Sequence, residues 1–272
     1  MSNPVIIVGS GLAGYAVARE LRKLDAEIPI MMLTGDHGGF YSKPMLSNAL
    51  ASGKAPESII TGDTAQMASQ LKISIRPHCR VAVINQPKQT ITLTDGEEVA
   101  YDQMVLALGA DQVRLPLSGS GVEKILSVND FDDYKKFRDE LIGKKRISII
   151  GAGLIGCEFA NDLAAAGYQV DVIDISAQPL GRLLPPEGGA FIRQKLEAVG
   201  VVFHLNTSTQ SVEQENGRLR LTFSEGRSIE SDLVLSAVGL LPRTQLAAAA
   251  GIQINRGIMV NRLLQTQFAN IY

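Results

Sequence analysis

The residues of this sequence that could take part in chemistry are grouped around two glycine-rich turns with the same spacing. The first turn is Gly9–Gly14 (GSGLAG) and the second is Gly151–Gly156 (GAGLIG). Between a strand and a helix, the first glycine permits a tight bend, the second lets backbone approach a pyrophosphate, and the third allows close helix packing. The helix N–H groups then face the anion. One such turn is a weak signal, but two in this context predict two dinucleotide sites.

The two copies differ in the acidic residue that should close the second strand, about 20 residues on, and accept hydrogen bonds from a ribose 2′-hydroxyl. In the second copy Asp174 stands at this point. Its carboxylate would repel the 2′-phosphate of NADPH, which predicts NADH; an aspartate that only caps the next turn is the alternative. The first copy has no acid at the strand end, so Thr34 or the slightly later Asp36 would have to bind the ribose.

The cysteines and histidines give no sign of a redox or metal centre. Cys79 and Cys157 are far apart and belong to no C-x-x-C pair or metal-ligand spacing, so they are interpreted as two reduced thiols. His37, His78 and His204 form no cluster, and turn or surface positions are favoured over catalysis. Hydride transfer between cofactors needs no protein acid or base, so no general base and no metal site are assigned.

The elements that must position the turns repeat along the chain. In each copy an apolar strand precedes the turn, an apolar-faced helix follows it, and a β-meander leads to an apolar strand that ends near Gly109 or Gly239. Such strands joined by helices are typical of a parallel sheet covered on both faces. We expect an α/β fold with two doubly wound Rossmann-like domains, the second inserted in the first: 1–113, 114–241 and a return at 242–272. Helices are predicted near 130–141 and, as core packing, at 246–250.

Composition narrows the function class. The chain has 272 residues and a net charge of −2, with both signs scattered, which argues against nucleic acid or an anionic membrane as partner. The apolar start at 5–18 lacks a preceding basic region and contains three glycines, so it is read as strand and helix rather than a signal peptide. No apolar run approaches the roughly 20 residues needed to cross a bilayer. A soluble cytoplasmic protein is expected.

These motifs, the segment Tyr41–Ser47 (YSKPMLS) and the G-x-G-x-x-G-x-E form at Gly151–Glu158 resemble the two-dinucleotide-binding-domain flavoprotein reductases over the whole chain. Within these the sequence is most similar to the rubredoxin reductases of bacterial alkane oxidation, and next to the flavorubredoxin reductases. The resemblance implies that the first turn binds FAD and the second binds NADH, with single electrons passed to rubredoxin. A flavorubredoxin reductase, an NADH oxidase and a nucleotide-binding fragment without turnover are the alternatives.

The resemblance also implies site residues. Lys43 and Glu158 would meet beside the isoalloxazine, one from each domain, where a cation stabilises the anionic reduced flavin and a carboxylate limits the cost of burying it; a solvated lysine and a helix-surface glutamate are the alternative. The expected FAD contacts are Gly9, Ser10, Gly11, Leu12, Ala13, Gly14, Leu33, Thr34, Ser42, Lys43, Arg80, Val81, Ala107, Leu108 and Gly109. The expected NADH contacts are Gly151, Gly153, Leu154, Ile155, Gly156, Glu158, Asp174, Arg182, Val238 and Gly239.

The sequence departs from related enzymes at two places. NADH oxidases of this fold carry a redox cysteine where Ser42 and Lys43 stand, so reduced flavin is expected to pass electrons directly to an external one-electron iron protein. The chain stops at 270–272, where the family continues into a Gly-Asp pair that binds FAD and a β-rich third domain. We therefore expect the C-terminal part of the family fold to be absent.

Overall fold

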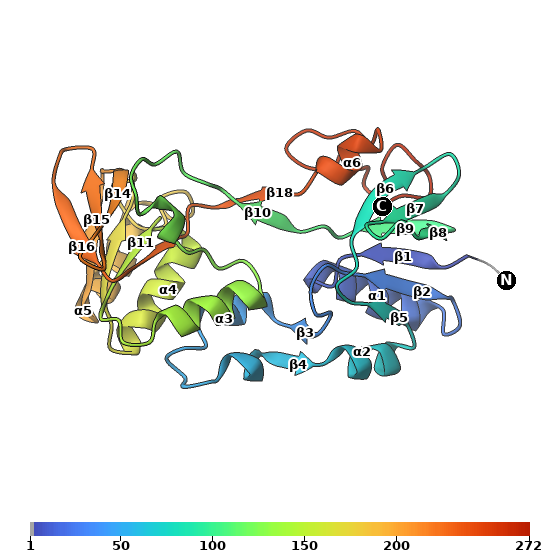
Figure 1. Cartoon of the computed structure of the whole chain (residues 1–272), viewed down its shortest axis with the longest axis horizontal. Helices are drawn as coiled ribbons and strands as arrows, with labels where there is room; N and C mark the ends of the chain where they lie inside the picture. The colour runs from blue at the N-terminus through green and yellow to red at the C-terminus, as the bar shows by residue number, and fades with distance from the viewer. Residues whose placement is uncertain (1–2) are drawn as a thin grey trace. The chain divides into compact units, whose positions relative to one another are not determined.

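The computed structural model of the chain describes residues 3–272 and divides into two compact units (Figure 1). Unit 1 comprises the chain up to Lys43, Ile60–Asp111 and Leu241–Tyr272, and unit 2 comprises Pro44–Ile59 and Gln112–Leu240. Each unit contains a four-stranded parallel sheet, as the predicted Rossmann-type α/β class requires. Residues 44–59 belong to unit 2, although the sequence had suggested the first domain.

The sheet of unit 1 has the strand order β5-β2-β1-β9, with parallel pairing throughout. Its strands are β1 (Val5–Val8), β2 (Ile30–Leu33), β5 (Ser74–Arg76) and β9 (Gln103–Leu106). Every residue of β1 is paired on both sides, and Val5 lies opposite Ile30 and Gln103. This central position explains why β1 is entirely apolar.

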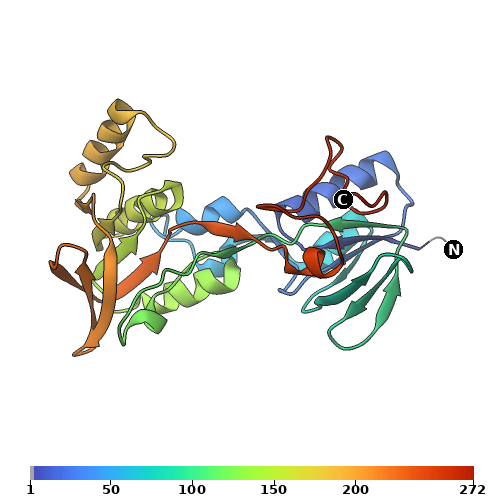
Figure 2. The same ribbon diagram turned by 90° about the horizontal axis from the view of Figure 1, so that it is seen from above.

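The two faces of this sheet carry separate cores. Ile7 packs toward the helices α1 (Leu12–Leu24) and α2 (Thr64–Leu71), and its neighbour Ile6 packs toward the meander. The meander consists of β6 (Val81–Asn85), β7 (Thr90–Leu93) and β8 (Glu98–Ala100). Figure 2 shows α1 in blue and the meander in teal on opposite sides of the sheet. Side chains alternate along a strand, so consecutive isoleucines serve different cores.

Three further segments complete unit 1. The short strands β3 (Phe40–Tyr41) and β4 (Ile60–Gly62) pair antiparallel. Helix α6 (Gln245–Ala249) packs on β6 with Ala247 fully buried, which confirms the predicted core role of this run. At the end of the chain, the Tyr272 N–H donates to the Met104 carbonyl at 2.9 Å beside β9.

Unit 2 repeats the same plan. Its sheet has the order β13-β12-β11-β17, which corresponds strand by strand to unit 1 and confirms the internal repeat. The strands are β11 (Arg146–Ile150), β12 (Gln169–Ile173), β13 (Val201–His204) and β17 (Leu233–Ser236). The helices are α3 (Phe131–Glu140), α4 (Leu154–Ala165) and α5 (Pro186–Ala198). The meander consists of β14 (Thr209–Glu215), β15 (Arg218–Phe223) and β16 (Ser228–Ser231).

The core of unit 2 again has two sides. Ile150 and Ile173 pack with Leu221 and Phe223 of the meander. Beyond the other face, Phe159 of α4 meets Phe137 of α3 edge to face, with 5.5 Å between ring centroids. Short elements of the chain are the 3₁₀ turns η1 (Lys43–Ser47), η2 (Pro56–Ile59) and η3 (Val122–Lys124), and the connecting strands β10 (Ala110–Gln112) and β18 (Leu240–Pro242).

Candidate functional site

The first glycine turn joins β1 to α1. Close packing leaves no room for a side chain at its first and last glycines, Gly9 and Gly14. Gly9 has a φ of +115°, and a Cβ added there would lie 2.2 Å from the Ala107 carbonyl oxygen. A Cβ on Gly14 would lie 1.9 Å from the Gly9 carbonyl oxygen. A Cβ on Gly11 would meet nothing within 4 Å. The middle of the turn is therefore open, and its backbone fits the close approach of a pyrophosphate.

Polar residues around this turn gather on one carboxylate oxygen. Oδ1 of Asp36 accepts hydrogen bonds from Ser10 Oγ at 2.9 Å, Thr34 Oγ1 at 2.7 Å and the Gly38 N–H at 2.9 Å. Burial acts to raise the pKa of Asp36, but these hydrogen bonds outweigh it and hold the pKa below its ordinary value. No acidic residue stands at the end of β2, but Asp36, two residues after Thr34, brings a carboxylate to the first glycine turn. Thr34 and Asp36, the two candidates for the ribose contact, therefore both lie at this turn.

We expect Asp36→Asn to lower the melting temperature at neutral pH. Because the folded pKa of Asp36 is lowered, its stabilisation is complete above the ordinary carboxyl pKa and is lost as the pH falls through the lower folded value. The difference between the melting temperatures of the two proteins should therefore shrink as the pH falls below the ordinary carboxyl pKa. Exposed Asp102→Asn is the matched control, and a pH-independent difference for Asp36→Asn would contradict the assignment.

The other expected FAD contacts of unit 1 are placed unequally. The Leu33 side chain is fully buried in the core, which leaves its main chain for the turn, where its carbonyl accepts from the Gly9 N–H at 2.8 Å. The Arg80 guanidinium lies against Gly35, because a Cβ added to Gly35 would be 2.7 Å from the guanidinium carbon of Arg80. Val81 packs at the edge of the meander core. Ser42 and Lys43 are half-buried at the end of the first segment of unit 1.

Arg243, which was not among the expected site residues, holds the segment after β9. Arg243 Nη1 donates to the Leu108 carbonyl at 3.2 Å, and Nε donates to Asp111 Oδ1 at 2.6 Å. Its own N–H donates to the Gly109 carbonyl at 3.0 Å. Arg243 therefore holds Leu108 and Gly109, which follow β9 beside the first turn.

The second glycine turn joins β11 to α4 with the same geometry. Gly151 has a φ of +109°, and a Cβ there would lie 2.7 Å from the Ala237 carbonyl oxygen. A Cβ on Gly156 would lie 1.9 Å from the Gly151 oxygen, while one on Gly153 would meet nothing within 4 Å. Leu154 and Ile155 begin α4 with exposed side chains. The turn again leaves open backbone where a pyrophosphate would bind.

Asp174 follows β12 and is bound to this turn. Its Oδ2 accepts from the Ala152 N–H at 2.6 Å, and its Oδ1 accepts from the Ser176 N–H at 2.7 Å. A carboxylate has about four acceptor positions, so these two bonds leave capacity for ribose hydroxyls. Asp174 thus organises the loop, and its predicted role toward NADH stays a prediction.

A cavity of about 470 Å³ opens beside Asp174 in unit 2. Among its walls are the glycine turn, Asp174–Ser176, Leu180–Leu183 and Thr207–Thr209. Of the expected NADH contacts, it is lined by Gly151, Gly153, Asp174, Arg182 and Val238. Its size and its position at the carboxyl ends of parallel strands fit part of a dinucleotide.

Residues 44–59 are fastened to α3 and α4 by contacts that the sequence did not reveal. Ser47 Oγ donates to Glu158 Oε2 at 2.5 Å. One turn further along α4, buried Asp162 accepts from the Leu50 N–H at 3.0 Å and the Ala51 N–H at 2.9 Å. Glu158 is thus half-buried and held by Ser47. In the sequence, the i, i+4 spacing of Glu158 and Asp162 was the one indication that both acids lie on the same face of α4.

The thiols and possible metal ligands are arranged without an evident reactive centre. Burial, with the charges of Asp174 and Glu158, raises the pKa of Cys157 to about 11, which keeps the thiol protonated. Burial also raises the pKa of Cys79. Within residues 3–272, no three His, Cys, Asp or Glu side chains are grouped as metal ligands. In the same range, no helix is long and apolar enough to span a bilayer.

Comparisons with known proteins agree on one family. Residues 3–272 match the family described as pyridine nucleotide-disulphide oxidoreductase. The chain is 44% identical to rubredoxin-NAD(+) reductase of Acinetobacter baylyi, covering 99% of this chain and 70% of that protein. It is 37% identical to the nitric oxide reductase FlRd-NAD(+) reductase of Aeromonas hydrophila, covering 100% and 70%.

Solved structures show the same fold. A ferredoxin reductase from Rhodopseudomonas palustris superposes with a TM-score of 0.92 at 28% identity, over 99% of this chain and 67% of that one. Putidaredoxin reductase, in its covalent complex with putidaredoxin, gives a TM-score of 0.91 at 30% identity, over 99% and 66%.

Proposed function

The chain belongs to the pyridine nucleotide-disulphide oxidoreductase family, whose cofactors here are FAD and NADH, and we propose that it reduces rubredoxin. The identity of 44% to a rubredoxin-NAD(+) reductase supports this acceptor. The resemblance to the reductases of alkane oxidation supports a place in an alkane hydroxylation system. The observation that carries the proposal is the pair of open glycine turns, of which the second adjoins Asp174 and a cavity.

In this proposal each unit holds one cofactor. The backbone around Gly11 binds the FAD pyrophosphate, and the backbone around Gly153 binds that of NADH. When bound, FAD accepts a hydride and returns single electrons, which needs no thiol relay. Lys43 and Glu158 are proposed as the residues that act on the bound flavin, and Ser47 holds the Glu158 carboxylate.

An anaerobic titration tests the proposal. NADH is added to the FAD-loaded protein while flavin absorbance is followed, and rubredoxin is then added. We expect NADH to bleach the flavin and rubredoxin to restore its absorbance. A colourless protein that binds NADH without turnover would instead favour a nucleotide-binding fragment, and a flavin unaffected by NADH would contradict the proposal.

A second acceptor is favoured by one observation, the identity of 37% to an FlRd-NAD(+) reductase. The same reduced protein should therefore be offered rubredoxin, flavorubredoxin and oxygen in parallel. Faster oxidation by flavorubredoxin would replace the proposed acceptor, and faster oxidation by oxygen would indicate an NADH oxidase.

Asp174→Ala is expected to weaken NADH binding about tenfold to a hundredfold, the value of a hydrogen bond to a charged group. Bound FAD should be unchanged, because the substitution lies in unit 2. Dissociation constants for NADH and NADPH measure the effect, with exposed Glu187→Ala on α5 as control. Loss of FAD instead of NADH would reverse the assignment of the two units, and equal rates with NADPH in the unmodified protein would remove the role of Asp174 in selectivity.

A further inference from the structure

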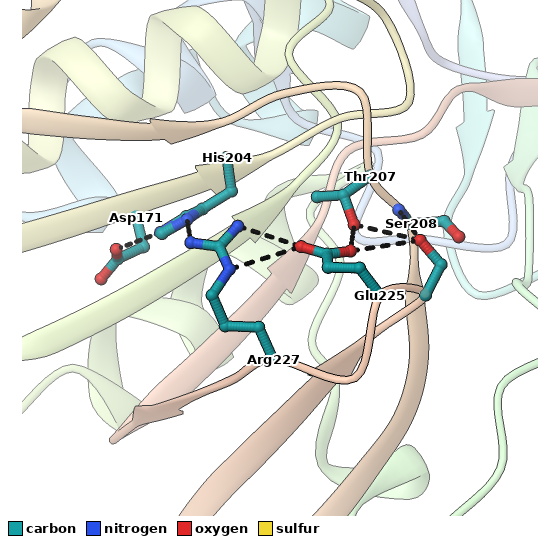
Figure 3. A network of polar contacts seen from close by, with 7 residues as sticks. Asp171, His204, Thr207, Ser208, Glu225 and Arg227 are labelled. Carbon is teal, nitrogen blue, oxygen red and sulfur yellow. Dashed lines mark hydrogen bonds and ion pairs between the residues drawn. The ribbon is translucent and has the colours of Figure 1, made fainter.

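A polar network lies beside the cavity of unit 2 (Figure 3). Asp171 belongs to β12 and His204 ends β13. Glu225 and Arg227 lie in the turn between β15 and β16, and Thr207 lies between β13 and β14. Three segments that are distant in the sequence, at 171, 204–207 and 225–227, therefore share one set of hydrogen bonds.

The network reaches the cavity through Thr207–Thr209, which we call the rim loop because all three residues line the cavity. Thr207 is buried, and its hydroxyl donates a hydrogen bond to the Glu225 carboxylate. The Thr207 N–H donates to the Asp174 carbonyl at 3.2 Å. One residue thus connects the network to the segment that carries the expected ribose contact.

Glu225 is the charged centre of the network. Arg227 Nη2 donates to Glu225 Oε1 at 3.0 Å, opposite the oxygen that accepts from Thr207. The hydrogen bond from Thr207, one from the backbone of Glu225 and the Arg227 guanidinium lower the pKa of Glu225 to about 2. Glu225 is therefore ionised at neutral pH and accepts both hydrogen bonds as a carboxylate.

The chemistry of the donors fixes the far end of the network. Arg227 Nη1 lies 3.3 Å from His204 Nδ1, and because a guanidinium only donates, Nδ1 must be the acceptor. The imidazole proton is then on Nε2, which donates to Asp171 Oδ1 at 2.7 Å. Asp171 lies three residues before Asp174. The network therefore contacts the chain around Asp174 at two points, through Asp171 and through Thr207.

We propose that Thr207, Glu225 and Arg227 are positioning residues that hold the rim loop in place for the adenosine half of NADH. The inference rests on the proposed function. Asp174 marks the adenosine end because its expected ligand is the ribose 2′-hydroxyl, and the rim loop is bonded to Asp174. A loop ordered in advance reduces the entropy lost on binding, so the network should affect NADH affinity and leave hydride transfer unchanged.

The test compares matched variants of the FAD-loaded protein. Thr207→Val removes the hydroxyl at similar volume, and Thr207→Ser keeps it. Glu225→Ala is compared with Glu230→Ala, because both side chains are 44% exposed and both pair with arginine in the same meander. Calorimetric titration gives the dissociation constants of NADH and of ADP-ribose, which keeps the adenosine and the pyrophosphate but lacks the nicotinamide. Steady-state kinetics separate KM from kcat, and thermal melting checks folding.

We expect Thr207→Val and Glu225→Ala each to raise both dissociation constants about fivefold to tenfold, the value of one net hydrogen bond, at unchanged kcat. Thr207→Ser and Glu230→Ala should behave as the unmodified protein, and the double variant should fall short of the product of the single effects. Unchanged affinities in Thr207→Val and Glu225→Ala would overturn this inference alone. If Thr207→Val fails to fold, exposed Glu225→Ala still decides. An unmodified protein that binds neither NADH nor ADP-ribose would overturn the proposed function as well.

Discussion

Replacing Gly9 with alanine is expected to destabilise unit 1 by about 3 to 5 kcal/mol, from the strained backbone together with a steric clash. The φ of +115° is one that residues with a side chain rarely adopt, and the new Cβ would lie 2.2 Å from the Ala107 carbonyl oxygen. Neither atom can move cheaply, because the Ala107 N–H is itself bonded to the Val8 carbonyl at 2.9 Å. Denaturant unfolding measures the loss.

Gly11→Ala is the matched control for this prediction. Its Cβ would meet nothing within 4 Å and its φ of −69° suits alanine, so the free energy of unfolding should hardly change. A methyl group there would instead occupy the space through which a pyrophosphate approaches, and FAD content should fall. If Gly11→Ala kept its FAD, the first turn would not bind the pyrophosphate; if Gly9→Ala were as stable as the unmodified protein, the turn geometry would be wrong.

The difference between these two glycines shows what the sequence could predict. Turn, strand and helix follow from local spacing, and Val5–Val8, Gly9–Gly14 and the helix after them lie where the pattern placed them. The doubling of the pattern likewise predicted two related doubly wound units, and in the structure their sheets have the same strand order. Local physical chemistry fixes such features, since a buried strand must be apolar on both faces and a tight bend needs glycine.

The features that escaped prediction depend on contacts between distant residues. Asp36 was named beside Thr34 as a candidate ribose contact, but its hydrogen bond with Ser10 is evident only from the fold. Arg243 meets Leu108, which is 135 residues away, and Ser47 meets Glu158 at a separation of 111 residues. A single sequence has no periodicity that reports such pairs, so their roles had to come from the structure.

Asp162→Ala is expected to destabilise unit 2 by about 2 to 4 kcal/mol, because two backbone N–H groups would lose a charged acceptor whose side chain is buried. Asp162 is 4% exposed and accepts from Leu50 and Ala51 at 3.0 and 2.9 Å. Residues 44–59 should then loosen from α4, although Ser47 still bonds to Glu158. Amide hydrogen exchange measures this directly, and the Leu50 and Ala51 amides should exchange faster.

The loosening should also reach function, because residues 44–59 directly follow Lys43 and hold Glu158 through Ser47. On the proposed function, flavin reduction by NADH should slow in Asp162→Ala while the dissociation constant of ADP-ribose stays unchanged, since Asp162 does not line the cavity. Exposed Asp139→Ala on α3 is the control for charge removal near this segment. Unchanged exchange at Leu50 and Ala51 would mean that Asp162 does not hold the segment, whereas faster exchange with unchanged flavin reduction would separate the anchoring of residues 44–59 from electron transfer.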